Sequence, residues 1–340
     1  MTQMPTGFTS DNSISRNQKT FVSLAVWSPI PAPVSADAEL AATLNFAGQE
    51  KSAGTRRSYR SDWRIFTAWC AARDLNPLPA TPETVARFLS AEATAGVKAS
   101  TLGRRAAAIG YAHKLAGHRE PPTNAETVKA VMRGIRRTIG TAPARKAPAT
   151  AELVGEMLKH CPETLAGKRD RALLALGFAG AFRRSELVAL EVTDLAEVPH
   201  GLRVMIRFSK GDQEGVGQEI AIPRGCRLRP VEAVQIWLAG AGISTGPVFR
   251  PVLKGNRLQA APLTDRSVAA IVKRYAALAG LDPAQFSGHS LRSGFLTSGA
   301  EAGASIFKLM EVSRHRSVDT LRGYVRSADL FRDHAGVGFL

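Results

Sequence analysis

The sequence predicts a mainly α-helical protein of two domains, the second of which adds a small antiparallel sheet. Apolar residues recur at helical spacing along most of residues 39–138 and again from Thr150 onward. Two β-branched or alternating runs, 201–208 and 218–222, flank a polar, glycine-rich stretch and predict one hairpin. A chain of 340 residues is also long enough for two ordinary domains, each with its own core.

Residues 1–38 and the segment after them differ in pattern. The first 38 residues mix Ser, Thr, Asn and Pro without sustained periodicity, so we expect a disordered tail of unknown role. Beyond it, Tyr59, Trp63, Phe66 and Cys70 are spaced i, i+4, i+7 and i+11, which places them on one face of a helix.

Three more helices are expected in this first domain, over 39–138. Thr81 followed by Pro82 is a cap and a first-turn proline, and the other two helices span about 100–116 and 124–137. Basic side chains lie off the apolar faces, among them Arg56, Arg60, Arg104 and Arg105. One such face is ordinary for a solvated helix, but its repetition favours an all-α domain that grips phosphates.

A change of composition separates the two domains. Residues 139–149 (IGTAPARKAPA) hold two prolines, a glycine and two basic residues, which favours an extended linker; a surface loop within one domain is the alternative. The second domain, 150–340, is expected to place its hairpin between two groups of helices, at about 150–160, 168–179, 184–192, 229–239, 265–279, 290–302, 304–312 and from Ser317.

The charge balance points to a polyanionic partner. Lys and Arg number 45 against 29 Asp and Glu, a net charge of +16, and nucleic acid is the commonest intracellular polyanion. The three cysteines (Cys70, Cys161, Cys226) show neither disulfide nor zinc spacing, so we expect reduced thiols that serve as small core residues. No apolar run approaches the roughly 20 residues of a membrane span, so we expect a cytoplasmic protein with no membrane partner.

Two short sequence motifs of the second domain each contain an arginine and a second polar residue three positions away. GAFRRSELVAL holds Arg183 and Glu186, and GHSLRSGF holds His289 and Arg292; each pair shares one face of a helix. Gly288 allows close backbone approach just before the second pair. Taken alone, the first motif is compatible with a surface ion pair, and the second is compatible with a capping histidine beside a surface arginine.

Two further candidates are a lysine and a tyrosine. Lys210 opens the hairpin turn, and Tyr324 lies in SRHRSVDTLRGYV, nine residues after His315. On one continuous helix His315 and Tyr324 would lie on opposite sides, but Ser317 is a good N-cap, so we expect a break that lets both face one cavity. Alone, the lysine could be a solvated hairpin residue and the tyrosine a packing residue.

Together these residues suit attack on a phosphodiester. Two arginines can hold the non-bridging oxygens, a tyrosine is the nucleophile, a lysine is the acid for the leaving 5′-oxygen, and histidines transfer protons. The sequence has no acidic cluster suited to Mg²⁺ and no Walker motif, so we expect neither a metal nor a nucleotide cofactor.

In order, spacing and local words (RRSEL, GHSLR), the series resembles the active-site signature of the tyrosine recombinase (phage integrase) family. The resemblance implies that Arg183 and Arg292 clamp the phosphate, that Lys210 is the general acid and that Tyr324 is the nucleophile. It further implies that His289 is a proton acceptor or phosphate ligand, that His315 is a phosphate ligand and that Glu186 supports the site from behind.

The resemblance extends over about residues 45–330 and is Cre-like, with an N-terminal SAM-like core-binding domain, although Cre has tryptophan in place of His315. It implies that Arg104 lies on a major-groove helix and that Arg266 reads a guanine. It also implies a C-terminal segment that docks in trans, here short and broken by Gly336 and Gly338. The first 38 residues look too short for an arm-binding domain, which favours a simple core-site recombinase.

By this resemblance the chain would bind double-stranded DNA with inverted half-sites. It would be a monomer or weak oligomer when free and a tetramer on DNA, and it would exchange strands through 3′-phosphotyrosyl intermediates and a Holliday junction. Two alternatives remain: a type IB topoisomerase-like enzyme with the same chemistry, and a catalytically silent DNA-binding protein of the same fold.

Overall fold

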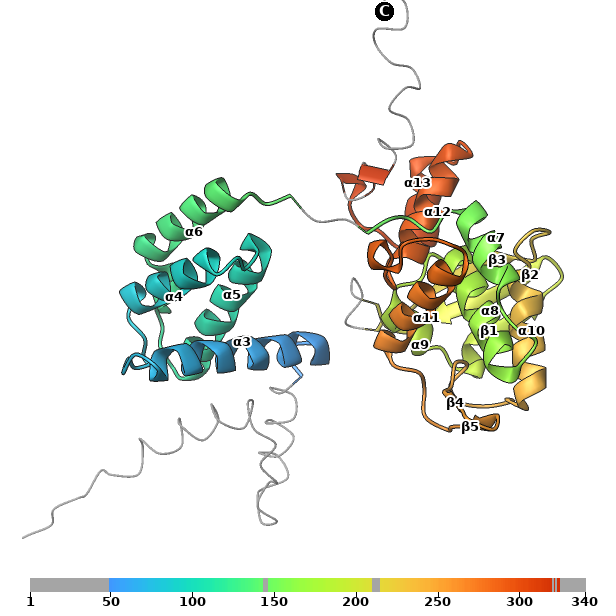
Figure 1. The fold of residues 1–340 in the computed structure, drawn as a ribbon, viewed down its shortest axis with the longest axis horizontal. Helices are drawn as coiled ribbons and strands as arrows, with labels where there is room; N and C mark the ends of the chain where they lie inside the picture. The colour runs from blue at the N-terminus through green and yellow to red at the C-terminus, as the bar shows by residue number, and fades with distance from the viewer. Residues whose placement is uncertain (1–48, 143–145, 210–214, 320, 322, 325–340) are drawn as a thin grey trace, which may run out of the picture. The chain divides into compact units, whose positions relative to one another are not determined.

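The computed structural model describes residues 49–142, 146–209, 215–319, 321 and 323–324 (Figure 1). The chain divides into two compact units, Met1–Pro143 and Ala144–Leu340, and each unit is described by itself. The expected N-terminal tail, Lys210 and the expected trans-docking segment lie outside the described residues.

The described part of the first unit is helical throughout, as predicted. The stripe on its first helix is confirmed, because Phe66 and Cys70 are fully buried and the Trp63 ring lies 5.6 Å from the Phe66 ring. The second helix begins at Pro82, where the Thr81 hydroxyl accepts from the Thr84 amide at 3.2 Å. The elements are α3 (Ala53–Ala71), α4 (Pro82–Thr94), α5 (Ala99–Leu115), the 3₁₀ turn η1 (Pro122–Asn124) and α6 (Glu126–Ile139).

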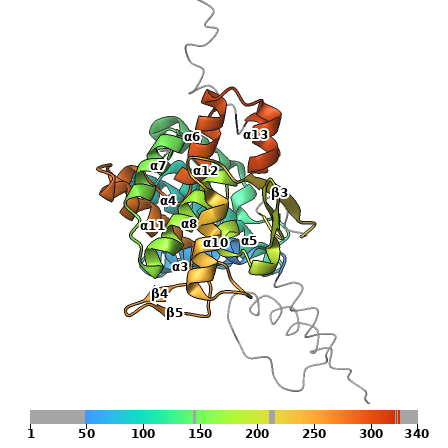
Figure 2. The same ribbon diagram turned by 90° about the vertical axis from the view of Figure 1, so that its right-hand side faces the viewer.

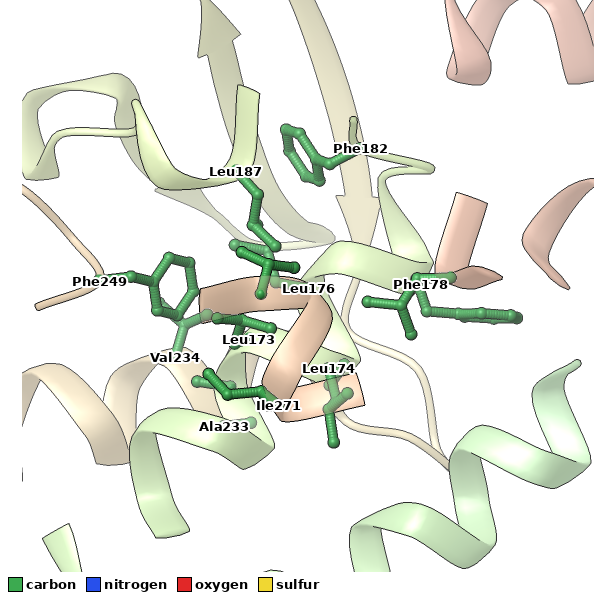
Figure 3. Packing of buried hydrophobic residues seen from close by; sticks show 14 of the residues in the cluster. Leu173, Leu174, Leu176, Phe178, Phe182, Leu187, Ala233, Val234, Phe249 and Ile271 are labelled. Atoms are coloured by element: carbon green, nitrogen blue, oxygen red, sulfur yellow. The ribbon is translucent and has the colours of Figure 1, made fainter. Parts of the chain in front are cut away.

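The second unit is built around α8, a helix that is buried along most of its length. Leu173, Leu174 and Leu176 are fully buried and pack among side chains such as Val234 and Phe249 (Figure 3). The second half of α8, residues 172–179, is apolar on all sides, and such a segment is stable only inside a core. The helices are α7 (Ala151–Lys159), α8 (Leu165–Ala179), α9 (Arg184–Val188), α10 (Pro230–Ala241), α11 (Asp265–Leu278), α12 (Ser290–Glu301) and α13 (Ile306–Ser313), with the short turns η2 (Val192–Asp194) and η3 (Pro283–Gln285).

A three-stranded antiparallel sheet of order β1-β2-β3 covers part of this core. The predicted hairpin is present as β2 (Gly201–Ile206) and β3 (Gln218–Pro223). The sequence analysis missed β1 (Leu195–Val198) and the pair β4 (Val252–Leu253) and β5 (Arg257–Leu258). Strands of two to four residues are too short to show an alternating pattern. In Figures 1 and 2, β4 and β5 lie at the end of the unit opposite α12 and α13.

Residues 146–149, the second half of the expected linker, are bound to the second unit. The Ala147 amide donates to Gln285 O at 2.8 Å, and the Ala149 amide donates to Ser290 O at 2.9 Å. Gly294 on α12 makes this approach possible, because a Cβ there would overlap the Ala149 carbonyl. Residues 146–149 therefore pack as part of the second unit, which the sequence could not show because such hydrogen bonds leave no periodic signal.

The expectations for cysteines, metal sites and membrane spans can be compared with the residues that the structure describes. Cys70 and Cys161 are buried, but Cys226 is exposed, so the prediction of three core thiols is wrong for Cys226. No group of three His, Cys, Asp or Glu in the described ranges is placed to hold a metal ion. No helix within them is long and apolar enough to cross a membrane.

The contact at Gly294 gives a stability prediction. Gly294→Ala should lower the free energy of unfolding of the second unit by about 1–3 kcal/mol, because the added methyl displaces backbone. The matched control is Gly155→Ala on α7, where the nearest atom is a Leu228 methyl at 3.8 Å. This control should be neutral or stabilising by about 0.5–1 kcal/mol. Urea unfolding of both variants tests the contact, and equal midpoints would contradict it.

Candidate active site

The turn after α8 carries the first two site residues. Arg183 is the N-cap of α9 and Glu186 is its third residue, so the two meet across a helix start and not on one helical face as expected. The Arg183 amide donates to Glu186 Oε2 at 2.9 Å, and its guanidinium binds Oε1. Only 3% of Glu186 is exposed, so its carboxylate faces the protein interior.

The second pair repeats this arrangement at the start of α12. His289 is the N-cap and Arg292 is the third residue of the helix. Arg292 is fully enclosed, with 1% exposed, and its Nη1 donates to Ala181 O at 2.7 Å. A Cβ at Gly288 would touch the Arg184 side chain at 3.2 Å, which supports the expected close approach.

The helix is interrupted between His315 and Tyr324, as the sequence predicts. Helix α13 ends at Ser313, Arg314 adopts a left-handed conformation, and helical backbone resumes at Val318. The His315 ring lies against Arg292, with Nε2 3.2 Å from Nη2, and its Nδ1 is 2.7 Å from the Ser313 hydroxyl. His315 therefore belongs to a loop that contacts the arginine site.

Tyr324 reaches the same site from the last described helical segment. Its ring packs against a small cluster that includes Leu296, Leu309 and Leu321, while its hydroxyl lies 3.1 Å from His289 Nε2. The apolar ring is thus anchored and the polar end is directed to a histidine. Four of the sequence-predicted residues thus form two contacts, His289–Tyr324 and Arg292–His315, and the first turn of α12 carries one member of each.

Burial and nearby positive charge both favour the neutral form of the two histidines. Burial, then the charges of Arg292 and Arg183, lowers the pKa of His315 to about 4. The same causes in the same order lower the pKa of His289. Burial and the neighbouring arginines also lower the pKa of Arg292 to about 9, so this guanidinium remains charged at neutral pH. A neutral His289 beside the Tyr324 hydroxyl is able to accept its proton.

The sequence analysis missed two residues that hold this site together, Arg314 and Ser313. Arg314 is 8% exposed and binds Glu186 Oε2 at 2.8 Å, and the fully buried Ser313 contacts His315. The only signal for Arg314 in the sequence is its place beside His315, where a basic residue is easily taken for a surface side chain.

The DNA-contact candidates of the first unit differ in accessibility. Arg104 donates twice to the buried Asp62, at 2.7 and 3.0 Å, while its side chain stays 48% exposed. Arg105 is paired with Glu92 and lies near Asp62, and only 11% of its side chain is exposed. Arg104 is therefore held in place and open to a ligand, whereas Arg105 mainly serves ion pairs within the unit.

The remaining candidates lie near helix starts. Arg56 and Arg60 are partly exposed on the first turns of α3, and the Arg56 guanidinium contacts Gln49 at 3.5 Å. Arg266 is exposed on the first turn of α11 in the second unit. These positions are open to a ligand but are not part of the cluster around Tyr324.

Comparison with known proteins agrees with this geometry. Residues 149–330 match the phage integrase family, and residues 46–120 match the phage integrase N-terminal SAM-like domain. The chain belongs to the phage integrase family of tyrosine recombinases. The family expected from the sequence motifs is thereby confirmed, together with its mainly α fold.

Among full-length relatives, the integrase/recombinase xerD homolog of Selenomonas ruminantium is 40% identical over 294 residues, covering 84% of this chain and 85% of the relative. A tyrosine recombinase of Synechococcus elongatus is 30% identical over 294 residues, covering 81% and 85%.

Solved structures confirm the fold at low sequence identity. The XerH recombinase bound to a palindromic difH substrate aligns with a TM-score of 0.60 at 16% identity, covering 94% of each chain. A lambda integrase dimer bound to a core site aligns with a TM-score of 0.55 at 18% identity, covering 83% of this chain and 91% of that one.

The charge environment predicts how the histidines titrate in the free protein. The His315 imidazole should stay neutral down to a pKa of about 4, and His289 should titrate below its ordinary value of 6.5. Side-chain ¹⁵N NMR across the pH range measures both, and His289→Gln and His315→Gln assign the signals. A pKa at or above 6.5 for either ring would contradict the expected effect of burial and arginine charge.

Proposed function

We propose that this chain is a site-specific recombinase that cleaves one DNA strand with Tyr324 and rejoins it to another. The observation that carries the proposal is the 3.1 Å contact between the Tyr324 hydroxyl and His289 Nε2 beside the enclosed Arg292. The Tyr324 oxygen attacks the phosphorus, the bond to the 5′-oxygen breaks, and a 3′-phosphotyrosyl link forms. This link is itself a phosphodiester and conserves the energy of the broken bond, so a free 5′-hydroxyl can reverse the step by displacing the Tyr324 oxygen.

The histidines take different roles in this proposal. His289 accepts the tyrosine proton, because its neutral ring already lies within hydrogen-bond distance of the hydroxyl. His315 acts as a phosphate ligand beside Arg292, since its ring contacts that guanidinium. Arg183 and Arg292 hold the non-bridging oxygens and stabilise the charge that develops on them.

Lys210 is proposed to protonate the leaving 5′-oxygen. It lies outside the described residues, in the connection between the end of β2 at Ile206 and the start of β3 at Gln218. Its ammonium group would give one proton to the leaving 5′-oxygen, which would otherwise leave as an alkoxide.

The assembly is proposed to contain four protomers on two duplexes, each duplex carrying inverted half-sites, with a Holliday junction as intermediate. Two structural neighbours, a recombinase bound to a palindromic substrate and an integrase dimer bound to a core site, support the symmetric arrangement. The recombinase names of the relatives favour strand exchange over simple relaxation of supercoils. The net charge of +16 favours a DNA partner, and we place the protein in a bacterial cytoplasm.

The nucleophile can be tested with a nicked suicide duplex that carries the chain's own site, selected from DNA flanking its gene. Wild-type protein should form a denaturation-resistant DNA adduct because the nicked fragment diffuses away and prevents religation. Tyr324→Phe should form none, while Tyr59→Phe on α3, which lies in the first unit, should behave as wild type. An adduct with Tyr324→Phe would refute the assignment; site-independent relaxation of plasmid by the wild type would favour a topoisomerase.

Arg266 is proposed to read a base, so its loss should reduce specificity more than general affinity. Arg266→Ala should weaken binding to the chain's own site by about 1–3 kcal/mol and to scrambled DNA by much less. Lys273→Ala removes the same charge from the exposed side of the same helix. This control should change both affinities equally, as measured by fluorescence anisotropy at fixed salt. Equal losses for Arg266→Ala would leave Arg266 as a phosphate contact only.

A further inference from the structure

Arg314 lies where it contacts partners of both proposed phosphate-binding arginines. Its Nη2 donates to Glu186 Oε2 at 2.8 Å, and Glu186 also binds Arg183. The same Nη2 lies 3.1 Å from Ala181 O, which accepts from Arg292 as well. Arg314 therefore shares a carboxylate with one arginine and a carbonyl with the other.

Arg314 is largely buried, and its hydrogen bonds are made within the protein. The residue is 8% exposed, its Nη1 binds Gly180 O at 3.0 Å, and its guanidinium lies 5.3 Å from the centre of the Phe182 ring. Its backbone is left-handed, with φ of 57°, a region that residues with a Cβ seldom adopt. A charged side chain is kept in a disfavoured backbone position, and its contacts are all directed inward.

The charges of this cluster explain such an arrangement. Without Arg314, the Glu186 carboxylate would be neutralised by Arg183 alone, and Arg183 would offer little net charge to a phosphate. With Arg314 present, three guanidinium charges and one carboxylate leave two positive charges in the cluster. Two negative charges are present on the pentavalent phosphorane formed when a tyrosine attacks a phosphodiester, one more than in the ground state.

We propose that Arg314 is a positioning residue that offsets the Glu186 charge, so that Arg183 and Arg292 act on the phosphate with their full charge. This inference rests on the proposed function. It assigns to Arg314 an effect on the cleavage step and little effect on DNA binding, because the charge it supplies matters most where the phosphorane gains its second negative charge.

Three variants separate charge from architecture. R314M removes the charge but keeps an unbranched side chain with a Cβ in the left-handed position. R314K keeps the charge and loses the forked hydrogen bonds. E186Q/R314M removes the carboxylate together with its partner, which restores two positive charges to the cluster.

The assay is single-turnover adduct formation on the nicked duplex, with the dissociation constant measured in parallel. R314M should cleave about 100-fold more slowly, with a dissociation constant within about threefold of wild type. R314K should retain most of the rate, and E186Q/R314M should regain at least about tenfold over R314M. On a duplex with a methylphosphonate at the scissile position, where one charged oxygen is replaced by methyl, the R314M defect should shrink.

Several outcomes would overturn the inference. These are cleavage by R314M at the wild-type rate, an E186Q/R314M variant as slow as R314M, and an R314M defect that is equal on both substrates. The last two results would mean that Arg314 only holds the loop. If R314M does not fold, R314K and E186Q/R314M decide in its place, because a slow, folded double variant contradicts the charge balance. Absence of an adduct with the wild type would instead refute the proposed function, and this inference with it.

Discussion

The structure of the site depends on holding several like charges in a small, poorly solvated volume. Arg183, Arg292 and Arg314 are brought near one another, and their mutual repulsion together with burial lowers the pKa of both Arg292 and Arg314. The Glu186 carboxylate and the carbonyls of Ala181 and Gly180 accept hydrogen bonds from these guanidiniums and so offset the crowding of charge. Burial alone would raise the pKa of Glu186, but Arg314 and Arg183 together lower it, so the carboxylate stays ionised.

Secondary-structure boundaries bring these charges together. Arg183 and His289 are both N-caps, and Glu186 and Arg292 are both third residues of the helices that follow. His315 lies just beyond the end of α13, so it too is placed by a helix terminus. At helix termini the backbone leaves unpaired amides and carbonyls, and those at Arg183 and Ala181 are used here as hydrogen-bond partners of the site.

Most of the fold could be predicted because long helices and the β2–β3 hairpin carry strong periodic signals, as the buried Phe66 and Cys70 illustrate. The break before Tyr324 was predictable from Ser317, since capping is a local property of the chain. The role of Arg314 was not, because it depends on a left-handed turn and on Glu186, 128 positions away. The packing of residues 146–149 on α12 was equally hidden, since it depends on one missing side chain at Gly294.

The charge balance also links DNA binding to the state of the histidines. Burial and then the arginine charges favour neutral rings for His289 and His315, which suits a proton acceptor but leaves His315 with only one N–H to donate. On the proposed function, a phosphate held by these guanidiniums would add negative charge beside both rings and would therefore raise the pKa of each. The repulsion among the arginines would then be offset by the substrate itself, and the His315 ring, which contacts Arg292, would lie next to the added charge.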